Sequence, residues 1–317
     1  MPLKYLIMKI LLQFPEGLKQ HALEHAKKLQ AEGHNVIISC APTYGACDIA
    51  IDEAKAIKAD KIIHFGHAEF APKAQKLDYP IEYIEYSVKV DLSVLETSLD
   101  ILKEFKTIAL VTTVQHLQQL YEIKDFYKKH GKKILIGKPN AFAKYDGQVL
   151  GCDAGSATSV ENSADCILYF GGGMFHPIGA LMETKKPFII VDPFSNKIED
   201  ISSMREIYKK KSRGKILSAI EAIRFGIIVS TKNGQMKMQA ATAIESAIKK
   251  QGLEAYILTT NNIDFDSLNN MLEFDAFVNT ACPRISEDNE RLRKPLLNPN
   301  ELYELLKIKE EINKKKE

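Results

Sequence analysis

An internal repeat is the feature that most constrains how this chain of 317 residues folds. The octamer ADKIIHFG, residues 59–66, returns as ADCILYFG at residues 164–171, and the spacing between Cys47 and Cys152 equals the spacing between the two octamers. A third, more diverged copy is FDAFVNTACPR, residues 274–284. Self-similarity at a fixed distance indicates one structural unit used several times, so the three stretches should occupy equivalent places in similar units.

The residues before these stretches agree as well. Each copy opens with an apolar segment (IMKILLQF, KTIALVTT and FGIIVST), continues with a helix that ends in lysine and glycine, and returns to a second apolar strand. The glycines at the expected helix ends are Gly33, Gly131 and Gly252. Strands that alternate with amphipathic helices predict parallel sheets joined by right-handed crossovers.

We therefore predict an α/β fold of three similar domains, each a small parallel sheet flanked by helices, arranged around a central site. The predicted domains span residues 1–100, 101–208 and 209–317. The joints are expected near residues 95–105 and in the basic segment YKKKSRGK, residues 208–215.

The charge balance argues against several classes of partner. With 43 basic and 41 acidic side chains the formal net charge is +2, so no strong field favours DNA, RNA or an anionic membrane. The N-terminal run YLIMKILLQF is interrupted by Lys9, is too short for a membrane span and lacks a small-residue cleavage site. We expect a cytoplasmic protein with no membrane association and no direct nucleic-acid contact.

Five cysteines at wide, irregular spacing do not resemble a secreted disulfide framework, so metal binding or catalysis is the better explanation for any that are functional. Ligands of open α/β sheets bind beyond the carboxyl ends of the strands, and Cys47, Cys152 and Cys282 each fall in a loop that fits such a place. Three domains packed around one axis would bring these thiolates together. Soft thiolates suit an iron-sulfur cluster or zinc, and three of them leave one metal corner free.

The alternative for these cysteines is a structural role, because unpaired cysteines are often buried and these three show no C-x-x-C spacing. Two further cysteines are expected in the core. Cys166 lies inside the strand ADCILYF, and Cys40 ends the apolar strand NVIIS.

A glycine-rich segment, FGGGMFHPIGA at residues 170–180, is the strongest local signal after the cysteines. Gly171, Gly172 and Gly173 would let backbone N–H groups approach an anion at the start of a helix, or would only form a tight turn. The segment lacks the G-x-G-x-x-G pattern and the P-loop lysine. Three histidines lie near these loops, as bases or as hydrogen-bonded structural residues: His64, His67 and His176.

Two polar loops complete the candidates. Arg284 follows Cys282 by two residues and would clamp a carboxylate beside the cluster, or form an ordinary ion pair. Asn233 and Gln235 lie between a strand and a helix of the third unit, and would donate neutral hydrogen bonds or cap the helix.

A series of motifs, in this order, is similar to a known family. The motifs are ILLQFPEGLK, TYGACD, IIHFGHAEF, GQVLGCD, FGGGMFHPIG, VDPFS and ACPRIS followed by KPLLNPNEL, and they run from residue 10 to residue 302. Together they resemble the diphthamide biosynthesis family over essentially the whole chain.

The resemblance implies a homodimer of three-domain chains in which Cys47, Cys152 and Cys282 bind one 4Fe-4S cluster. It implies that the reduced cluster, supplied by an electron donor, cleaves S-adenosylmethionine. The 3-amino-3-carboxypropyl group is then added to a histidine of translation elongation factor 2, the first step of diphthamide biosynthesis. The implied S-adenosylmethionine contacts are Gly171, Gly172, Gly173, Gln235 and Arg284, and no catalytic residue is expected beyond the cluster.

Two other classes of function stay open on the sequence. One is a non-catalytic, triplicated α/β module that binds a small anion through the glycine loop. The other is a structural zinc protein.

Overall fold

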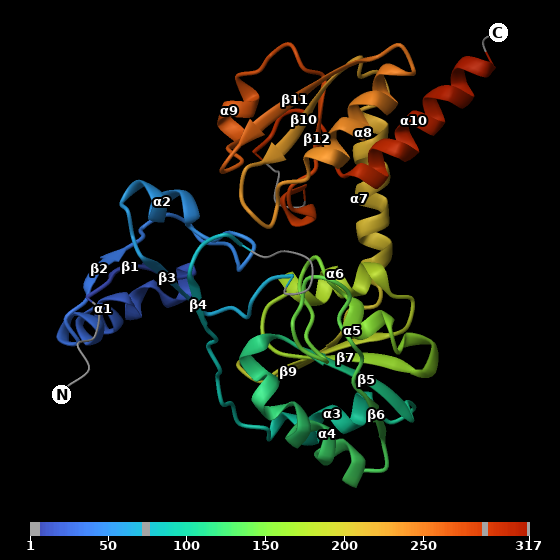
Figure 1. Cartoon of the computed structure of the whole chain (residues 1–317). Coiled ribbons are helices and arrows are strands. Elements are labelled where there is room, and N and C mark those ends of the chain that lie inside the picture. Colours follow the sequence, from blue (N-terminus) through green and yellow to red (C-terminus); the bar gives the residue numbers. More distant parts are fainter. Residues whose placement is uncertain (1–6, 72–76, 287–290, 316–317) are drawn as a thin grey trace. The chain divides into compact units, whose positions relative to one another are not determined.

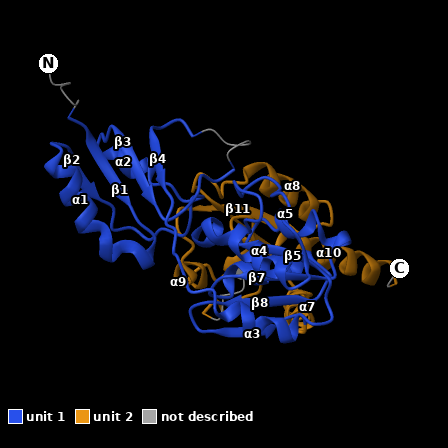
Figure 2. Ribbon diagram, turned by 90° about the horizontal axis from the view of Figure 1, so that it is seen from below, with its two compact units in different colours: residues 1–202 blue, residues 203–317 orange. Residues whose placement is uncertain are grey.

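The computed structural model describes residues 7–71, 77–286 and 291–315 (Figure 1). Its contacts divide the chain into two compact units, residues 1–202 and 203–317, coloured separately in Figure 2. We describe each unit by itself. Three sheets carry the fold, two in unit 1 and one in unit 2.

The first sheet has four strands, all paired in parallel. They are β1 (Lys9–Gln13), β2 (Asn35–Ile38), β3 (Lys61–Phe65) and β4 (Ile81–Ile84). The helical elements are η1 (Glu16–His21), α1 (Ala22–Ala31) and α2 (Ile51–Ala56). Successive side chains of a strand point to opposite faces, so Ile10 and Leu12 pack toward α1 while Leu11 packs toward α2. Because β1 is buried on both faces, its sequence is a continuous apolar run.

The second sheet follows the same plan with one added antiparallel strand. Its strands are β5 (Thr107–Thr112), β6 (Lys133–Leu135), β7 (Cys166–Phe170), β8 (Phe188–Asp192) and β9 (Lys197–Asp200). Its helical elements are α3 (Val94–Ile101), η2 (Val114–Gln119), α4 (Leu120–Lys129), α5 (Gly155–Thr158), η3 (Glu161–Ser163) and α6 (Phe175–Glu183).

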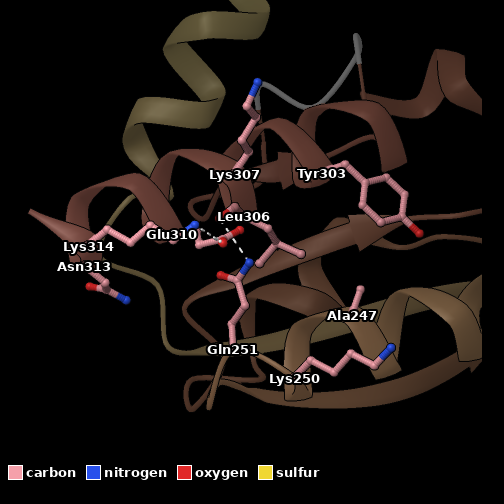
Figure 3. A pocket seen from close by; sticks show the side chains of 9 residues that line it. All are labelled: Ala247, Lys250, Gln251, Tyr303, Leu306, Lys307, Glu310, Asn313 and Lys314. Atoms are coloured by element: carbon pink, nitrogen blue, oxygen red, sulfur yellow. Dashed lines mark hydrogen bonds and ion pairs between the residues drawn. The ribbon is translucent and has the colours of Figure 1, made fainter.

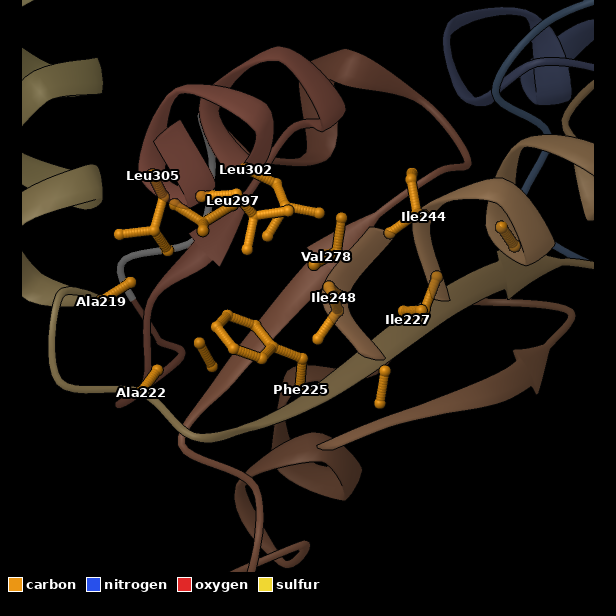
Figure 4. Packing of buried hydrophobic residues seen from close by; sticks show 14 of the residues in the cluster. Ala219, Ala222, Phe225, Ile227, Ile244, Ile248, Val278, Leu297, Leu302 and Leu305 are labelled. Atoms are coloured by element: carbon orange, nitrogen blue, oxygen red, sulfur yellow. The ribbon is translucent and has the colours of Figure 1, made fainter. Parts of the chain in front are cut away.

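The third sheet forms unit 2. Its parallel strands are β10 (Arg224–Ser230), β11 (Glu254–Thr260), β12 (Ala276–Asn279) and β13 (Leu296–Leu297). The helical elements are α7 (Met204–Ser218), α8 (Met238–Lys249), α9 (Phe265–Asn269), η4 (Pro283–Ser286) and α10 (Pro299–Lys314). Figure 4 shows the core, in which Phe225 and Val278 of the sheet pack against Leu302 and Leu305 of α10.

All three sheets share one strand order. The first strand of each lies between the second and the third, and the fourth strand follows the third: β2-β1-β3-β4, β6-β5-β7-β8 and β11-β10-β12-β13. The predicted α/β fold with three helix-flanked parallel sheets is confirmed. In this order the connections diverge on either side of the first strand, and ligands of open α/β sheets bind at the carboxyl end of such a strand.

The repeated aspartates explain the repeat in physical terms. The carboxylate of Asp165 accepts hydrogen bonds from the N–H groups of Lys106 and Thr107, where β5 begins. Asp60 accepts from Lys9 at the start of β1. Asp275 accepts from the backbone at the start of β10 in the same way. Each aspartate therefore satisfies backbone donors at the start of the central strand of its sheet.

The predicted domain bounds at residues 100 and 208 stay a prediction. Val94 and Leu95 of α3 pack in the core of the second sheet, and the basic segment 208–215 lies inside the continuous helix α7. No helix in the described parts of the chain is long and apolar enough to cross a membrane.

Candidate metal centre

The three candidate cysteines follow parallel strands of three different sheets. Cys47 lies between β2 and α2, and Cys152 lies between β6 and α5. Cys282 comes three residues after the end of β12. Cys152 is exposed and the other two are partly exposed, so all three residues lie outside the fully buried core that holds Cys166.

The third cysteine does not occupy the same place in the repeat as the first two. Cys47 and Cys152 precede the repeat aspartate of their sheet, whereas Cys282 follows Asp275 by seven residues. The counterparts of Cys282 by that count are His67 and Gly172. Two different loops of the repeated unit thus carry the candidate ligands.

The loop of Cys47 is held by an amide from the central strand. Nε2 of Gln13 donates to the carbonyl of Asp48 at 2.6 Å and to Oγ1 of Thr43 at 3.3 Å. Oε1 of Gln13 accepts from the N–H of Ala50 at 3.2 Å. Gln13 is buried, with 2% of its surface exposed, and it fixes the backbone after Cys47 and the side chain of Thr43 before it from inside the sheet.

Two histidines orient this amide. Nδ1 of His64 lies 2.9 Å from Oε1 of Gln13, and Nε2 of His64 lies 3.0 Å from Nδ1 of His67. An amide oxygen only accepts, so Nδ1 of His64 donates, and its Nε2 must then accept from His67 if the ring is neutral. Burial, together with neighbouring His67, lowers the pKa of His64 well below 6.5, and burial lowers the pKa of His67 to about 4. Both rings are neutral at pH 7, which fixes their tautomers.

Lys19 of η1 supports the beginning of the same loop. Its Nζ donates to the carbonyls of Cys40 and Ala41 at 3.1 and 3.0 Å, and it pairs with Glu16. The motif LQFPEGLK therefore supplies two of the side chains that hold this loop, Gln13 and Lys19. Asp48, 6% exposed, adds a bond within the loop, because its carboxylate accepts from the N–H of Tyr44 at 3.3 Å.

The loop of Cys152 is held by its own carboxylate. Asp153, 3% exposed, accepts hydrogen bonds from five backbone N–H groups at 2.8 to 3.2 Å. The donors are Asn140, Ala141, Phe142, Ala143 and Gly155. Hydrogen bonds to an ionised acceptor are the strong kind, so one side chain ties the residue after Cys152 to a segment that lies earlier in the chain.

The loop of Cys282 is held by Asn279, the last residue of β12. Its Nδ2 donates to the carbonyl of Cys282 at 2.7 Å, and its Oδ1 accepts from the N–H of Ala281 at 3.0 Å. Burial raises the pKa of the Cys282 thiol, while the backbone N–H of Arg284 and the charges of Lys237 and Arg284 act in the opposite direction. Those same groups would stabilise a thiolate ligand.

The remaining two cysteines differ from each other. Cys166 is fully buried in β7, as predicted, and burial raises the pKa of its thiol to about 12. The prediction for Cys40 is wrong, because Cys40 is exposed. Strand β2 is the edge strand of its sheet and already ends at Ile38, so Cys40 lies outside the core.

Within the described ranges, no group of three or more His, Cys, Asp or Glu side chains is placed to hold a metal ion. Cys47 and Cys152 belong to unit 1 and Cys282 belongs to unit 2. The donor set nonetheless fits an iron-sulfur cluster chemically: three soft, accessible thiols, each on a loop fixed by buried polar side chains.

The glycine loop joins β7 to α6, as predicted. Gly173 has a φ of +74°, and a Cβ at Gly172 would lie 2.9 Å from the ring of Phe194, so the sequence here must be glycine. Exposed apolar side chains surround the loop, namely Met174, Phe175 and Phe194. The sequence reading missed His116, a buried histidine whose ring lies 5.5 Å from that of Phe194.

The polar candidates of unit 2 lie where expected. Gln235 is 6% exposed in the loop between β10 and α8. Arg284 lies in η4, two residues after Cys282, with Nε and Nη1 shielded from solvent. His176, the remaining candidate histidine, lies in α6 directly after the glycine loop.

Unit 2 also carries a surface groove between α8 and α10, away from these loops (Figure 3). The groove is lined by charged residues such as Lys250, Lys307 and Glu310, together with Tyr303. No cysteine loop contributes to its lining, so the groove does not bear on the metal centre.

These sheets and loops are those of a known class of transferase. The family model described as diphthamide synthesis protein matches residues 14–317. The chain belongs to this family, and it is an enzyme, a 3-amino-3-carboxypropyl transferase.

The relatives agree over most of their length. The 2-(3-amino-3-carboxypropyl)histidine synthase of Pyrococcus horikoshii is 35% identical over 308 residues, 96% of this chain and 87% of that protein. Subunit 1 of the Caenorhabditis elegans enzyme of that name is 29% identical and aligns with 92% of this chain and 74% of its own. The crystal structure of Dph2 from Pyrococcus horikoshii with a 4Fe-4S cluster superposes with a TM-score of 0.88 at 33% identity, covering 95% of this chain and 86% of that one.

Proposed function

We propose that this enzyme uses Cys47, Cys152 and Cys282 to hold one 4Fe-4S cluster. It transfers the 3-amino-3-carboxypropyl group of S-adenosylmethionine to a histidine of translation elongation factor 2. The observation that carries the proposal is that each sheet of the repeat supplies one accessible cysteine on a loop after a parallel strand. The 4Fe-4S cluster in the structure of a relative with the same fold supports it.

When bound, the cluster would supply the electron that breaks the bond between sulfur and the aminocarboxypropyl carbon. The chain itself has to place the cofactor so that this bond, and no other, receives the electron. Three cysteine ligands leave one iron without a protein ligand, which is where the methionine part of the cofactor would approach.

The cofactor is proposed to contact the glycine loop and the polar loops of unit 2. The N–H of Gly171 donates to the carbonyl of Val191 at 3.0 Å, so the contact proposed for Gly171 is a close approach of its backbone, while the N–H groups of Gly172 and Gly173 are suited to the carboxylate end. The exposed rings of Phe175 and Phe194 beside them offer an apolar surface. Gln235 and Arg284 would add a neutral and a charged donor. We further propose a cytoplasmic homodimer that receives its electron from a separate donor.

The test is anaerobic reconstitution with iron and sulfide, followed by turnover. The reduced protein should give the electron paramagnetic resonance signal of a 4Fe-4S cluster. With S-adenosylmethionine and archaeal elongation factor 2 it should release methylthioadenosine and add the mass of one aminocarboxypropyl group to the factor. A cluster-loaded, reduced protein that releases no methylthioadenosine would contradict the proposed reaction.

The other two classes give different results in the same assay. A structural zinc protein would retain equimolar zinc and remain colourless after reconstitution. A non-catalytic anion-binding module would bind its ligand in calorimetry equally well with and without reductant. Neither would modify the factor.

A further inference from the structure

Gln13 is an amide in the interior of an apolar sheet. It ends β1 and pairs in register with His64, the residue four places after the repeat aspartate of its sheet. The residues at the same register position of the other two sheets are Val111 and Ile228, both buried. Two of the three repeats fill this position with an aliphatic side chain, so the packing of the sheet does not itself require an amide.

The hydrogen bonds of Gln13 show what the amide does instead. Both of its donors and both of its acceptor positions are used, three of them on the segment 43–50 and the fourth on His64. Cys47 lies inside that segment, directly before Asp48, whose carbonyl accepts the shortest of these bonds. A fully satisfied buried amide has one orientation, and it transmits that orientation to the loop.

We propose that Gln13, oriented by the ring of His64, is a positioning residue that fixes the Cys47 thiolate in the geometry needed for the cluster. The inference rests on the proposed function, because it takes Cys47 as a cluster ligand. Outer hydrogen bonds of this kind orient metal ligands and tune the metal. Gln13 does not bond the metal in this proposal and acts only through the backbone around Cys47.

The test compares Gln13→Leu with a matched control, Gln119→Leu. Gln119 is 5% exposed and holds the backbone N–H and carbonyl of Val90 at 2.9 and 3.0 Å, and Val90 does not belong to a cysteine loop. Both variants delete a buried amide that fixes a segment by two or more hydrogen bonds. Circular dichroism establishes folding first, and Gln13→Ile, which copies the third sheet, replaces Gln13→Leu if the latter is unfolded.

Two measurements then read the loop and the cluster separately. Hydrogen exchange of the metal-free protein should show the amide of Ala50 exchanging about tenfold faster in Gln13→Leu and unchanged in Gln119→Leu. After reconstitution, Gln13→Leu should show a shifted reduction potential and an altered electron paramagnetic resonance spectrum, and Gln119→Leu should match the wild type.

The outcomes distinguish a failure of the positioning role from a failure of the proposed function. A wild-type protein that assembles no 4Fe-4S cluster would overturn the proposed function and the positioning role together. A wild-type protein with a normal cluster, beside a Gln13→Leu variant with unchanged exchange, spectrum and potential, would overturn the positioning role alone. A purely structural role would destabilise both glutamine variants and leave both spectra as in the wild type, which also overturns it.

Discussion

The loop of Cys47 and the loop of Cys152 come from matching places in the repeat, yet different parts of the chain hold them. Gln13 reaches the first loop from the central strand of its sheet. Asp153 holds the second from within, through backbone N–H groups that lie ten to thirteen residues earlier in the chain. The central strand of the second sheet has Val111 where the first has Gln13.

The difference teaches that the repeated unit fixes where a loop begins and ends, while single buried polar side chains fix its path. The parallel strands are set by continuous apolar runs, and all three copies share these runs and the strand order. The path of a loop depends on which donors and acceptors are satisfied, and a single substitution changes that. Both loops have a buried aspartate after the cysteine, and Asp48 accepts from the N–H of Tyr44, but Asp153 accepts five backbone bonds and the amide of Gln13 reaches only the first loop.

The largest effect should come from the sulfurs themselves, and here the two loops should behave alike. Cys47→Ala, Cys152→Ala and Cys282→Ala should each abolish methylthioadenosine release, because a cluster with two cysteine ligands is not retained. Iron content, the cluster spectrum and product formation measure this. Full activity of Cys152→Ala would contradict this prediction, because the Cys152 loop would then carry no ligand that the cluster needs.

The matched controls for the sulfurs are the other two cysteines. Cys40→Ala should keep the wild-type turnover, because Cys40 is exposed and outside the candidate site. Cys166→Ala should also turn over normally, with a loss of about 1 kcal/mol in the free energy of unfolding from the buried volume removed. An inactive but folded and cluster-loaded Cys166→Ala variant would show that Cys166 takes part in turnover and is not only a core residue.

A second, smaller effect should separate the two loops. Asp153→Asn replaces a carboxylate that accepts five backbone hydrogen bonds, and one of its two acceptor oxygens becomes a donor facing backbone donors. We expect a loss of about 3 kcal/mol in the free energy of unfolding, measured by urea titration, since buried bonds to a charged acceptor are the costly ones to remove. Hydrogen exchange should rise in residues 140–155 and stay unchanged in residues 41–50.

The control for this prediction is Asp146→Asn, an exposed aspartate of the same segment. It should leave both the urea midpoint and the exchange pattern as in the wild type. Equal effects of the two substitutions would mean that Asp153 does not hold the loop, and faster exchange at residues 41–50 would mean that the two loops are coupled.

The sequence carried enough information for the sheets and for the positions of the cysteines. Apolar runs of five to eight residues and the glycines after each helix predict the strands, and Gly33, Gly131 and Gly252 do have positive φ angles. The repeat is exact at the aspartates because each accepts backbone N–H groups at the start of the central strand of its sheet. A task that all three copies share leaves a repeated pattern.

What the sequence did not reveal depends on distant contacts that one copy of the repeat makes alone. The partners of Gln13 lie 30 to 51 residues away, and the other two sheets have Val111 and Ile228 at its position, so neither a local nor a repeated pattern reports its role. A signal was nevertheless present: ILLQ, residues 10–13, ends in an amide where IALV, residues 108–111, and FGII, residues 225–228, end in an aliphatic residue. Cys40 was misplaced for the related reason that an apolar strand at the edge of a sheet looks, in sequence, like one at its centre.

The smallest predicted effect concerns the repeat aspartates, and it tests whether the sheets are alike at the start of their central strands. Bonds from the N–H groups of Thr107 and Lys106 lower the pKa of Asp165 below 3.8, so the ionised form stabilises the fold. That contribution is complete above the ordinary aspartate pKa and is lost as the pH falls through the lowered value. Asp165→Asn should therefore cost ~1 kcal/mol of unfolding free energy at pH 7, with the difference from the wild type shrinking below about pH 4.

The same substitution at Asp60 should have a similar effect at pH 7, because its carboxylate also receives a backbone N–H at the start of a central strand. Asp125→Asn, at an exposed position of α4, serves as the control and should change neither the urea midpoint nor its pH dependence. A pH-independent loss at Asp165 would mean that the side chain contributes by its size and not by its charge. A large loss of unfolding free energy for Asp165→Asn beside none for Asp60→Asn would mean that the two sheets differ at the start of their central strands as well as in their cysteine loops. If both losses are small and similar, the two sheets are alike at the start of their central strands, and the difference between their cysteine loops does not extend to these aspartates.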